Sequence, residues 1–393
     1  MSQEHQARIR RKVNTEVQVA LHMPASLYDI LVDAVEVGLE RQRSDGSFPP
    51  AHNGLYKEES TRVRTTANWA LASLRAFELT ENERYRCAAA DALDYLASDE
   101  VRPSRRTFLC RLTPEKDLCN GLLGQATPIL ALARGGQVLE SDEYLEIAAD
   151  VYHHHSFDPS VALWDKIEVT GENLGIDRTF NHQLIFAASA SPLAEHYESV
   201  ADELEQFVRK LPVRMGVYRD GLVKHHLCTG LSETRLLSQT KSYWKLALGY
   251  LLYKRHHYPA NSIRSKEVGY HSVNLFGLSI LKRNFPNLDV WNHQKIIDAV
   301  NYSTTESYRE QILELDRGLV NTPSGFHNAV CHTVFDIDDD RRDWWVREQL
   351  RRAYDFEQQE LNRNAADPEL QASNIYLISF LPDVTIPDSI RND

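Results

Sequence analysis

The sequence predicts an all-α protein, an (α/α)6 toroid in which helical hairpins alternate around a ring, with short β-hairpin inserts. Two kinds of helical pattern alternate along the chain: amphipathic segments with one charged face, and segments that are apolar or small almost all round. A helix that is apolar on every side is buried between neighbours, whereas an amphipathic helix keeps one face in solvent. Six buried helices separated by surface helices therefore predict an inner and an outer ring.

The amphipathic segments form the predicted outer ring. In the segment 193–211, Val200, Leu204 and Phe207 recur at helical spacing while acidic residues occupy the opposite face, which is the pattern of a helix packed on one side. We expect outer helices over residues 26–42, 82–98, 141–154, 193–211 and 341–362.

The inner helices each open with a polar cluster. We expect them over residues 64–77, 119–133, 177–190 and 270–281, with a fifth beginning at His327 and a sixth at Ser373. If the array closes into a ring, these polar starts meet at one face. Helix N-termini present unpaired N–H groups and partial positive charge, which suit a carboxylate or sugar oxygens.

Three segments interrupt the helical pattern. Residues 162–177 and 216–227 have the alternation and turn residues of short hairpins, and residues 45–56 form a loop rich in Gly and Pro before the first inner helix. Loops beside a cleft commonly shape access to it. No long linker divides the chain, so we expect an N-terminal arm over residues 1–24 and a single domain over 25–393.

Composition restricts the class of protein. Hydrophobic residues make up 42% and charged residues 25% of the 393 residues, with a net charge of −12, so a water-soluble globular protein is expected and a nucleic-acid partner is not. The five cysteines are scattered without a C-x-x-C pair, which favours free thiols. Neither a signal peptide nor a membrane span of about 18–20 apolar residues is found. We therefore expect a cytoplasmic location.

The strongest candidate for chemistry is the cluster over residues 177–183 (DRTFNHQ). Asp177 could serve as an acid/base or simply cap the following helix. His182 and Gln183 lie inside an otherwise apolar helix, where buried polar groups cost free energy unless hydrogen-bonded, so we expect them to line a wet cleft. Asp117 precedes the second inner helix in the same way. Because glycosidic cleavage commonly uses two carboxyl groups, the candidate catalytic residues are Asp177, His182 and Asp117.

Candidate substrate-binding residues recur at the inner-helix starts. Arginine can bind a carboxylate through two hydrogen bonds, and tryptophan can stack on a sugar ring, although Trp69 is as readily explained as core. The candidates are His52, Arg64, Asn68, Trp69, Asn120, Gln125, Arg178, Asn181, His271, Asn274, His327 and Asn328. We expect those at the starts of the first four inner helices to face one common cleft.

Metal and cofactor motifs are not expected. The triplet His225, His226 and Cys228 resembles half of a metal site without a second half of matching spacing. The acidic run at 336–340 departs from a calcium loop because Arg341 stands where glycine is needed. No phosphate loop or dinucleotide-binding glycine motif occurs. The prediction is a protein that requires neither metal nor cofactor.

The order of these motifs resembles the AglQ family, agl-cluster proteins linked to archaeal N-glycan assembly. The resemblance covers at least residues 40–190, and the run DRTFNHQ is its most specific part. The motifs that carry it are 45–50 (DGSFPP) with 52–54 (HNG), Arg64-x-Thr66-x-x-Trp69, 114–125 (PEKDLCNGLLGQ) and 177–183. The pattern is also similar to (α/α)-toroid carbohydrate enzymes such as unsaturated glucuronyl hydrolases. The resemblance implies a sugar or glycan substrate that contains hexuronic acid, or its lipid- or nucleotide-linked precursor.

Several functions remain open from the sequence. A glycoside-hydrolase-like enzyme is the first hypothesis, with Asp177 as principal acid/base, His182 and Asp117 as its partners, and Arg64 and Arg178 as carboxylate binders. Epimerase or lyase chemistry is the alternative, because it also needs a proton donor and acceptor around a ring. A non-catalytic glycan-binding protein of a glycosylation pathway is a third. Two carboxyls roughly 5–9.5 Å apart favour a glycosidase, whereas one carboxylate with an opposed histidine favours an epimerase or lyase. The oligomeric state is left open.

Overall fold

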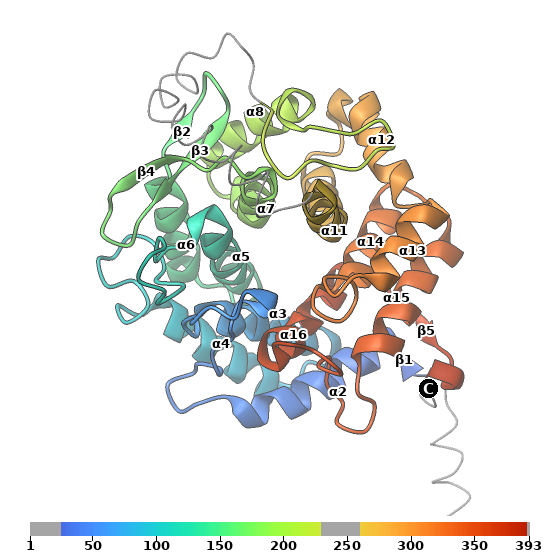
Figure 1. Ribbon diagram of the computed structural model, residues 1–393. Helices are drawn as coiled ribbons and strands as arrows, with labels where there is room; N and C mark the ends of the chain where they lie inside the picture. Colours follow the sequence, from blue (N-terminus) through green and yellow to red (C-terminus); the bar gives the residue numbers. More distant parts are fainter. Residues whose placement is uncertain (1–24, 229–259, 391–393) are drawn as a thin grey trace, which may run out of the picture.

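A computed structural model of the chain describes residues 25–228 and 260–390. The helices form a ring, with one layer around a central axis and a second layer outside it (Figure 1). The all-α toroid predicted from the sequence is confirmed. The predicted N-terminal arm, residues 1–24, lies outside the described residues, and the assignment of 25–393 to one domain stays a prediction.

The inner layer closes on itself. Helix α3 packs against α5, α5 against α7, α7 against α11 and α11 against α14, and the last inner segment, η5, contacts both α14 and α3. Each inner helix begins close to the residue expected from its polar cluster, except α11, which begins well before residue 270. The inner elements are α3 (Val63–Thr80), α5 (Gly121–Val138), α7 (Phe180–Ala190), α11 (Ala260–Asn284), α14 (Ser324–Val334), α16 (Pro368–Ser373) and the 3-10 helix η5 (Asn374–Phe380).

The outer layer covers the inner helices from the solvent side. Val200, Leu204 and Phe207 are buried as the amphipathic pattern predicts. Helices α12 and α13 were not expected, because each is only nine residues long and shows little more than two turns of periodicity. The outer helices are α2 (Leu27–Gly38), α4 (Glu83–Ala97), α6 (Asp142–His154), α8 (Glu198–Arg214), α12 (Gln294–Tyr302), α13 (Glu306–Glu314) and α15 (Asp339–Ala353).

The last outer helix ends earlier than predicted, at Ala353 rather than residue 362. The Asp355 side chain accepts the backbone N–H groups of Glu357 and Gln358 at 2.9 and 3.0 Å. Such a turn competes with continued helix formation.

Over residues 25–228 and 260–390, we find no helix with the length and hydrophobicity needed to cross a membrane.

The two ends of the described chain meet and close the ring. Strand β1 (Ala25–Ser26) pairs antiparallel with β5 (Thr385–Ile386), with Ala25 opposite Ile386. Ser26 then begins α2 with a capping box, in which its side chain and that of Asp29 accept each other's backbone N–H groups. Helix α2 also packs against the last inner segment, η5.

The remaining strands form inserts at one side of the ring. Strands β2 (Phe157–Asp158), β3 (Leu163–Ile167) and β4 (Asn173–Ile176) make an antiparallel sheet in that order, which confirms the hairpin predicted over 162–177. The segment 216–227 reverses at a tight turn with one bridge between Val217 and Val223.

The other 3-10 helices are η1 (Leu39–Arg41), η2 (Gly54–Tyr56), η3 (Ser191–Glu195), η4 (Asp289–Asn292) and η6 (Asp388–Ile390).

Trp69 belongs to the core between the two layers. It is buried and stacks on Phe48 with ring centroids 5.5 Å apart. Its ring fills the space next to Gly38 of α2, where an added Cβ would lie 2.4 Å from ring carbons. The sequence left Trp69 open as a sugar-stacking residue, and the structure places it in packing.

We predict that Gly38→Ala lowers the free energy of unfolding by about 1–3 kcal/mol, because the new methyl overlaps the Trp69 ring. Denaturant unfolding measures the change. The double variant Gly38→Ala/Trp69→Phe should recover part of the loss relative to Trp69→Phe alone. A stabilised Gly38→Ala, as helix propensity by itself would give, would contradict the packing.

Candidate functional site

A cavity of about 370 Å³ opens where α3, α5 and α7 begin. The expectation that inner-helix starts gather around one cleft is met for these helices and for α14. Five predicted site residues lie in its wall. They are Arg64, Asn120, Asn181, His182 and His327.

Gln125 lies outside this cavity and binds backbone. Its Oε1 accepts the Phe108 N–H at 2.7 Å, and its Nε2 donates to the Phe108 carbonyl at 3.0 Å. Gln183 holds Trp164 in the same manner, at 3.0 and 2.8 Å. The expectation that Gln183 needs a wet cleft is therefore wrong, since its buried amide is satisfied by the backbone.

His271 and Asn274 lie on the buried side of α11. The Nε2 of His271 contacts the Ala299 carbonyl at 3.0 Å, and burial lowers the pKa of this imidazole to about 4. The cavity-facing side of the helix is instead formed by Lys266 and Tyr270, which are one turn apart. The sequence correctly placed α11 beside the cleft but selected the wrong face of the helix.

The other predicted binding residues also lie outside the cavity wall. Asn68 is buried and donates to the Ser373 hydroxyl at 3.0 Å. Asn328 is buried against the Tyr308 hydroxyl. Two further residues complete this group: His52, which is exposed, and Arg178, which lines a separate, more open hollow beside β4.

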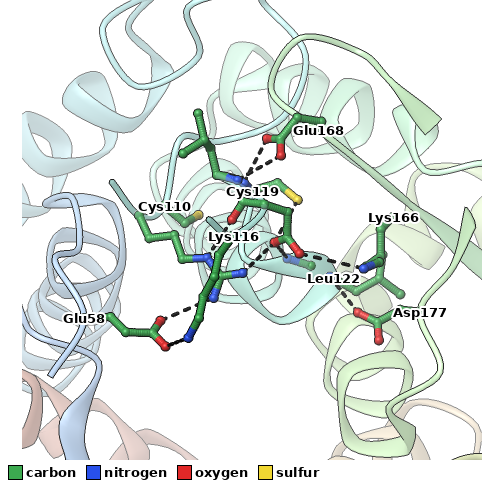
Figure 2. A network of polar contacts seen from close by, with 12 residues as sticks. Glu58, Cys110, Lys116, Cys119, Leu122, Lys166, Glu168 and Asp177 are labelled. Carbon is green, nitrogen blue, oxygen red and sulfur yellow. Dashed lines mark hydrogen bonds and ion pairs between the residues drawn. The ribbon is translucent and has the colours of Figure 1, made fainter. Parts of the chain in front are cut away.

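Asp177 stands directly behind His182. It is only 4% exposed. Its Oδ2 lies 2.9 Å from Nδ1 of His182 and accepts the Leu122 N–H at 3.3 Å, while Oδ1 accepts the Thr179 N–H at 3.1 Å. In Figure 2, Asp177 points at Leu122 in the first turn of α5. The residue does not cap its own helix, which begins at Phe180, but binds a free N–H of the neighbouring one.

The protonation state of Asp177 follows from these partners. Burial alone would raise its pKa, but the His182 ring, the Thr179 N–H and the charge of Lys166 together lower the pKa from 3.8 to about 2. A charged carboxylate only accepts hydrogen bonds, so Nδ1 of His182 carries the proton. In the neutral ring Nε2 is then the free base, and the ring lines the cavity.

Gly121 allows this arrangement. It begins α5 with φ of +59°, and a Cβ there would lie 2.7 Å from Oδ2 of Asp177 and 3.4 Å from Nδ1 of His182. The absence of a side chain at this position therefore makes room for the carboxylate–imidazole pair.

Asp117 supports the start of α5 from outside the cavity wall. Its Oδ1 accepts the Gly121 N–H and a hydrogen bond from Arg111, both at 2.9 Å. Glu168 accepts the N–H groups of Leu118 and Cys119 at 2.8 and 3.1 Å. Figure 2 shows Glu168 beside Cys119, just before the first turn of this helix. Carboxylates at a helix N-terminus are favoured by its dipole.

The cavity wall is strongly cationic. Among its described residues the only carboxylate is Glu58, against five cations: Arg64, Arg111, Lys116, Lys266 and Arg317. Glu58 is ion-paired with Lys116 and Arg111. Burial would raise its pKa, but Lys116, Asn53 and Arg111 lower it overall.

The remaining cations, on α3, on α11 and before α14, form no ion pair with any described residue. The protein as a whole is acidic, with a net charge of −12, so this positive charge is local to the cavity. It favours an anionic ligand.

Two further imidazoles line the cavity. Burial lowers the pKa of His327 to about 3, and burial together with nearby positive charge does the same for His225. His327 is 7% exposed, and its Nδ1 has no hydrogen-bond partner among the described residues. His225 stacks on Tyr270 at 5.5 Å. Both rings are therefore neutral at physiological pH.

Sequence reasoning missed several residues of the wall. Most lie in loops, where no periodic pattern marks them; Lys266 precedes the helix start that we predicted. The missed polar residues include Tyr56, Glu58, Arg111, Lys116, His225, Lys266, Tyr270 and Arg317. Within the described ranges, no three His, Cys, Asp or Glu side chains are grouped as metal ligands would be.

Comparison with known proteins identifies a sequence relative. No family model matches the chain. The chain is 37% identical over 366 residues to "Archaeal glycosylation protein Q" of Haloferax volcanii, and the alignment covers 92% of this chain and 99% of the relative.

Solved carbohydrate enzymes share the fold. Cellobiose 2-epimerase from Spirochaeta thermophila superposes with a TM-score of 0.58 at 14% identity, over 87% of this chain and 90% of that one. An unsaturated glucuronyl hydrolase specific for heparin superposes with a TM-score of 0.57 at 10% identity, over 90% and 95%. At such low identity these likenesses show the ring fold alone.

We predict that the stability supplied by Asp177 depends on pH. Because folding lowers its pKa from 3.8 to about 2, the ionised carboxylate contributes roughly 2 kcal/mol above pH ~4, and this is lost as the pH falls through ~2. The gap in unfolding free energy between wild type and Asp177→Asn should therefore shrink on acidification. Denaturant titrations at both pH values measure it, and a gap that stays constant would contradict the assignment.

We predict that Gly121→Ala is more damaging than Gly54→Ala. Both glycines have positive φ, +59° and +62°, so both variants strain the backbone by a similar amount. Only at Gly121 does the added Cβ meet Asp177; at Gly54 its nearest neighbour is Leu370, 3.9 Å away. Gly121→Ala should lower stability by about 1–3 kcal/mol more than its control. Equal losses in thermal and denaturant unfolding would show that the contact is unimportant.

Proposed function

Because the chain belongs to the family of archaeal glycosylation protein Q, we propose that it is a carbohydrate-active enzyme acting on a hexuronic acid of a glycan or glycan precursor, and that it epimerises this sugar by moving a proton at carbon. The observation that carries the proposal is the His182–Asp177 pair in a cation-rich cavity without a free carboxyl among its described lining residues.

The cationic wall supports a carboxylate-bearing sugar. Arg64 projects into the cavity from α3 and is held by a hydrogen bond to Asn53 at 3.2 Å. A guanidinium matches the two oxygens of a carboxylate. Asn120 and Asn181, at the starts of α5 and α7, supply amides for the sugar hydroxyls.

The same groups suit proton abstraction next to a carboxylate. In a hexuronic acid, C5 is bonded to the carboxylate carbon, so Nε2 of His182 would take the C5 proton while the electron pair moves into the carboxylate. The Arg64 guanidinium, bound to this carboxylate, stabilises the negative charge that develops on its oxygens. A proton that water donates to the other face of C5 gives the epimer, and His182 releases its proton from Nε2 to solvent. Asp177 is a positioning residue in this scheme, because it keeps the proton on Nδ1.

Hydrolysis, the first hypothesis from the sequence, receives less support. It calls for two carboxyl groups, one of which holds a proton for the leaving oxygen. Asp177 has a pKa of about 2, and the pKa of Glu58 is also lowered. A carboxyl that is ionised at working pH is a poor general acid.

The five cysteines support the predicted cytoplasmic location. All are free, and three of them, Cys110, Cys119 and Cys331, are buried. Free thiols are typical of a reducing compartment. Precursors of a glycan are thus proposed as the substrates, rather than an exported product.

We predict that the enzyme incorporates deuterium at C5 of a hexuronic acid in D2O. Proton abstraction by His182 exchanges the carbon-bound hydrogen with solvent, which NMR and mass spectrometry detect. The substrates are free and 1-phosphate-linked glucuronic acid, incubated at neutral pH. Release of free glucuronic acid from the 1-phosphate without carbon-bound deuterium would contradict the proposal and favour hydrolysis; an unsaturated product would assign elimination after the same first step.

We predict that His182→Gln lowers this exchange by roughly 10²–10⁴-fold, the usual contribution of general acid–base catalysis. Asp177→Asn should fall within the same range, because it loses control of the tautomer. His154→Gln, on outer helix α6, is the control and should retain wild-type exchange. Melting temperatures measured on the same preparations separate loss of chemistry from loss of fold. Full exchange by a folded His182→Gln would remove this residue from the mechanism.

A further inference from the structure

Four side chains form a cluster at the rim of the cavity, here called the rim cluster: Tyr56, Lys266, Tyr270 and Arg317. Tyr56 lies on η2 and is 42% exposed, which places the cluster at the opening. Lys266 and Tyr270 follow each other by one turn on α11, and Arg317 precedes α14. All four line the cavity.

The geometry of the rim cluster brings two cations beside two hydroxyls. The Tyr56 and Tyr270 hydroxyl oxygens are 2.9 Å apart. The Arg317 guanidinium carbon lies 4.6 Å from the Tyr56 ring centroid, and the Lys266 ammonium nitrogen lies 5.6 Å from the Tyr270 ring centroid. These cation–π contacts with the two tyrosine rings orient both cationic side chains.

Neither cation of the rim cluster is neutralised by a described carboxylate. Glu267, next to Lys266 in the sequence, is buried. Its carboxylate accepts hydrogen bonds from the Tyr218 hydroxyl at 3.0 Å and from the backbone N–H of His225 at 3.1 Å. Burial would raise the pKa of Tyr56, but its bond to Tyr270 and the nearby cations lower it overall. Lys266 and Arg317 therefore place uncompensated positive charge at the opening of the cavity.

We propose that the rim cluster binds a phosphate, and that the substrate is a hexuronic acid linked through its anomeric carbon to a phosphate or pyrophosphate. The inference rests on the proposed function and assigns the second anionic group of the same substrate. A phosphate carries more charge and more acceptor oxygens than a carboxylate, so a guanidinium, an ammonium and two hydroxyls suit it. Arg64 alone matches the carboxylate.

The position at the rim agrees with a substrate that extends out of the cavity. A volume of about 370 Å³ is at the small end of ligand pockets. It accommodates the sugar while a larger carrier stays in solvent. The phosphate that joins sugar and carrier would then lie at the opening. A lipid carrier and a nucleotide carrier present the same chemistry there.

Calorimetry with three probes tests the assignment: glucuronic acid, glucuronic acid 1-phosphate and glucose 1-phosphate. Wild type should bind glucuronic acid 1-phosphate at least about 10-fold more tightly than glucuronic acid. Arg317→Gln should weaken binding of both phosphates by about 10- to 100-fold, the worth of one charged hydrogen bond, and leave glucuronic acid unchanged. Arg64→Gln is the matched variant: it should weaken both glucuronates and leave glucose 1-phosphate unchanged.

The outcomes separate this inference from the proposed function. Equal affinity for glucuronic acid and its 1-phosphate, or an Arg317→Gln variant that weakens both equally, would overturn the phosphate site. Deuterium exchange with free glucuronic acid would still stand in that case. A uridine diphosphate hexuronate and a short-chain polyprenyl phosphate hexuronate then distinguish the carriers. Binding of either as tightly as the 1-phosphate supports the site, and exclusion of both would contradict it.

Discussion

The carboxylate of Asp177 is the interaction on which the arrangement of the cavity depends. A charge that is almost fully buried persists only where hydrogen bonds and opposite charge offset its desolvation. The N–H groups of Leu122 and Thr179 and the ring of His182 supply this compensation. One side chain therefore joins the starts of two inner helices and sets the direction of the imidazole between them. Gly121 makes the contact possible because no Cβ occupies the place of the carboxylate.

Acidic and basic groups near the cavity have different roles. The carboxylates serve the scaffold: Asp117, Glu168 and Asp177 accept backbone N–H groups around the start of α5, and Glu58 is ion-paired with Lys116. The cations that remain face the cavity: Arg64, Lys266 and Arg317. An overall acidic protein thereby acquires a positive interior surface. This division determines both the sign of the ligand and the chemistry that we propose, since imidazole rather than a carboxyl group is left to carry a proton.

The ring and its two layers could be predicted because helical periodicity reports burial directly. The candidate site was only partly predictable, since a polar residue in an apolar helix faces either the cavity or a backbone group, and periodicity does not tell these apart. Gln125 and His271 bind backbone atoms of Phe108 and Ala299, which tertiary packing alone brings near. Residues from loops, such as Arg317, reach the cavity by a path that local sequence does not specify.

The central claim is that Asp177 holds the proton of His182 on Nδ1 and leaves Nε2 free toward the cavity. Nitrogen NMR of ¹⁵N-histidine-labelled protein reports the tautomer directly, with His182→Gln identifying the signal. At a pH where the ring is neutral, we predict a protonated Nδ1 and an unprotonated Nε2 in wild type, and loss of that preference in Asp177→Asn. A wild-type ring protonated on Nε2 would contradict the account, because the base would then have no free nitrogen facing the sugar.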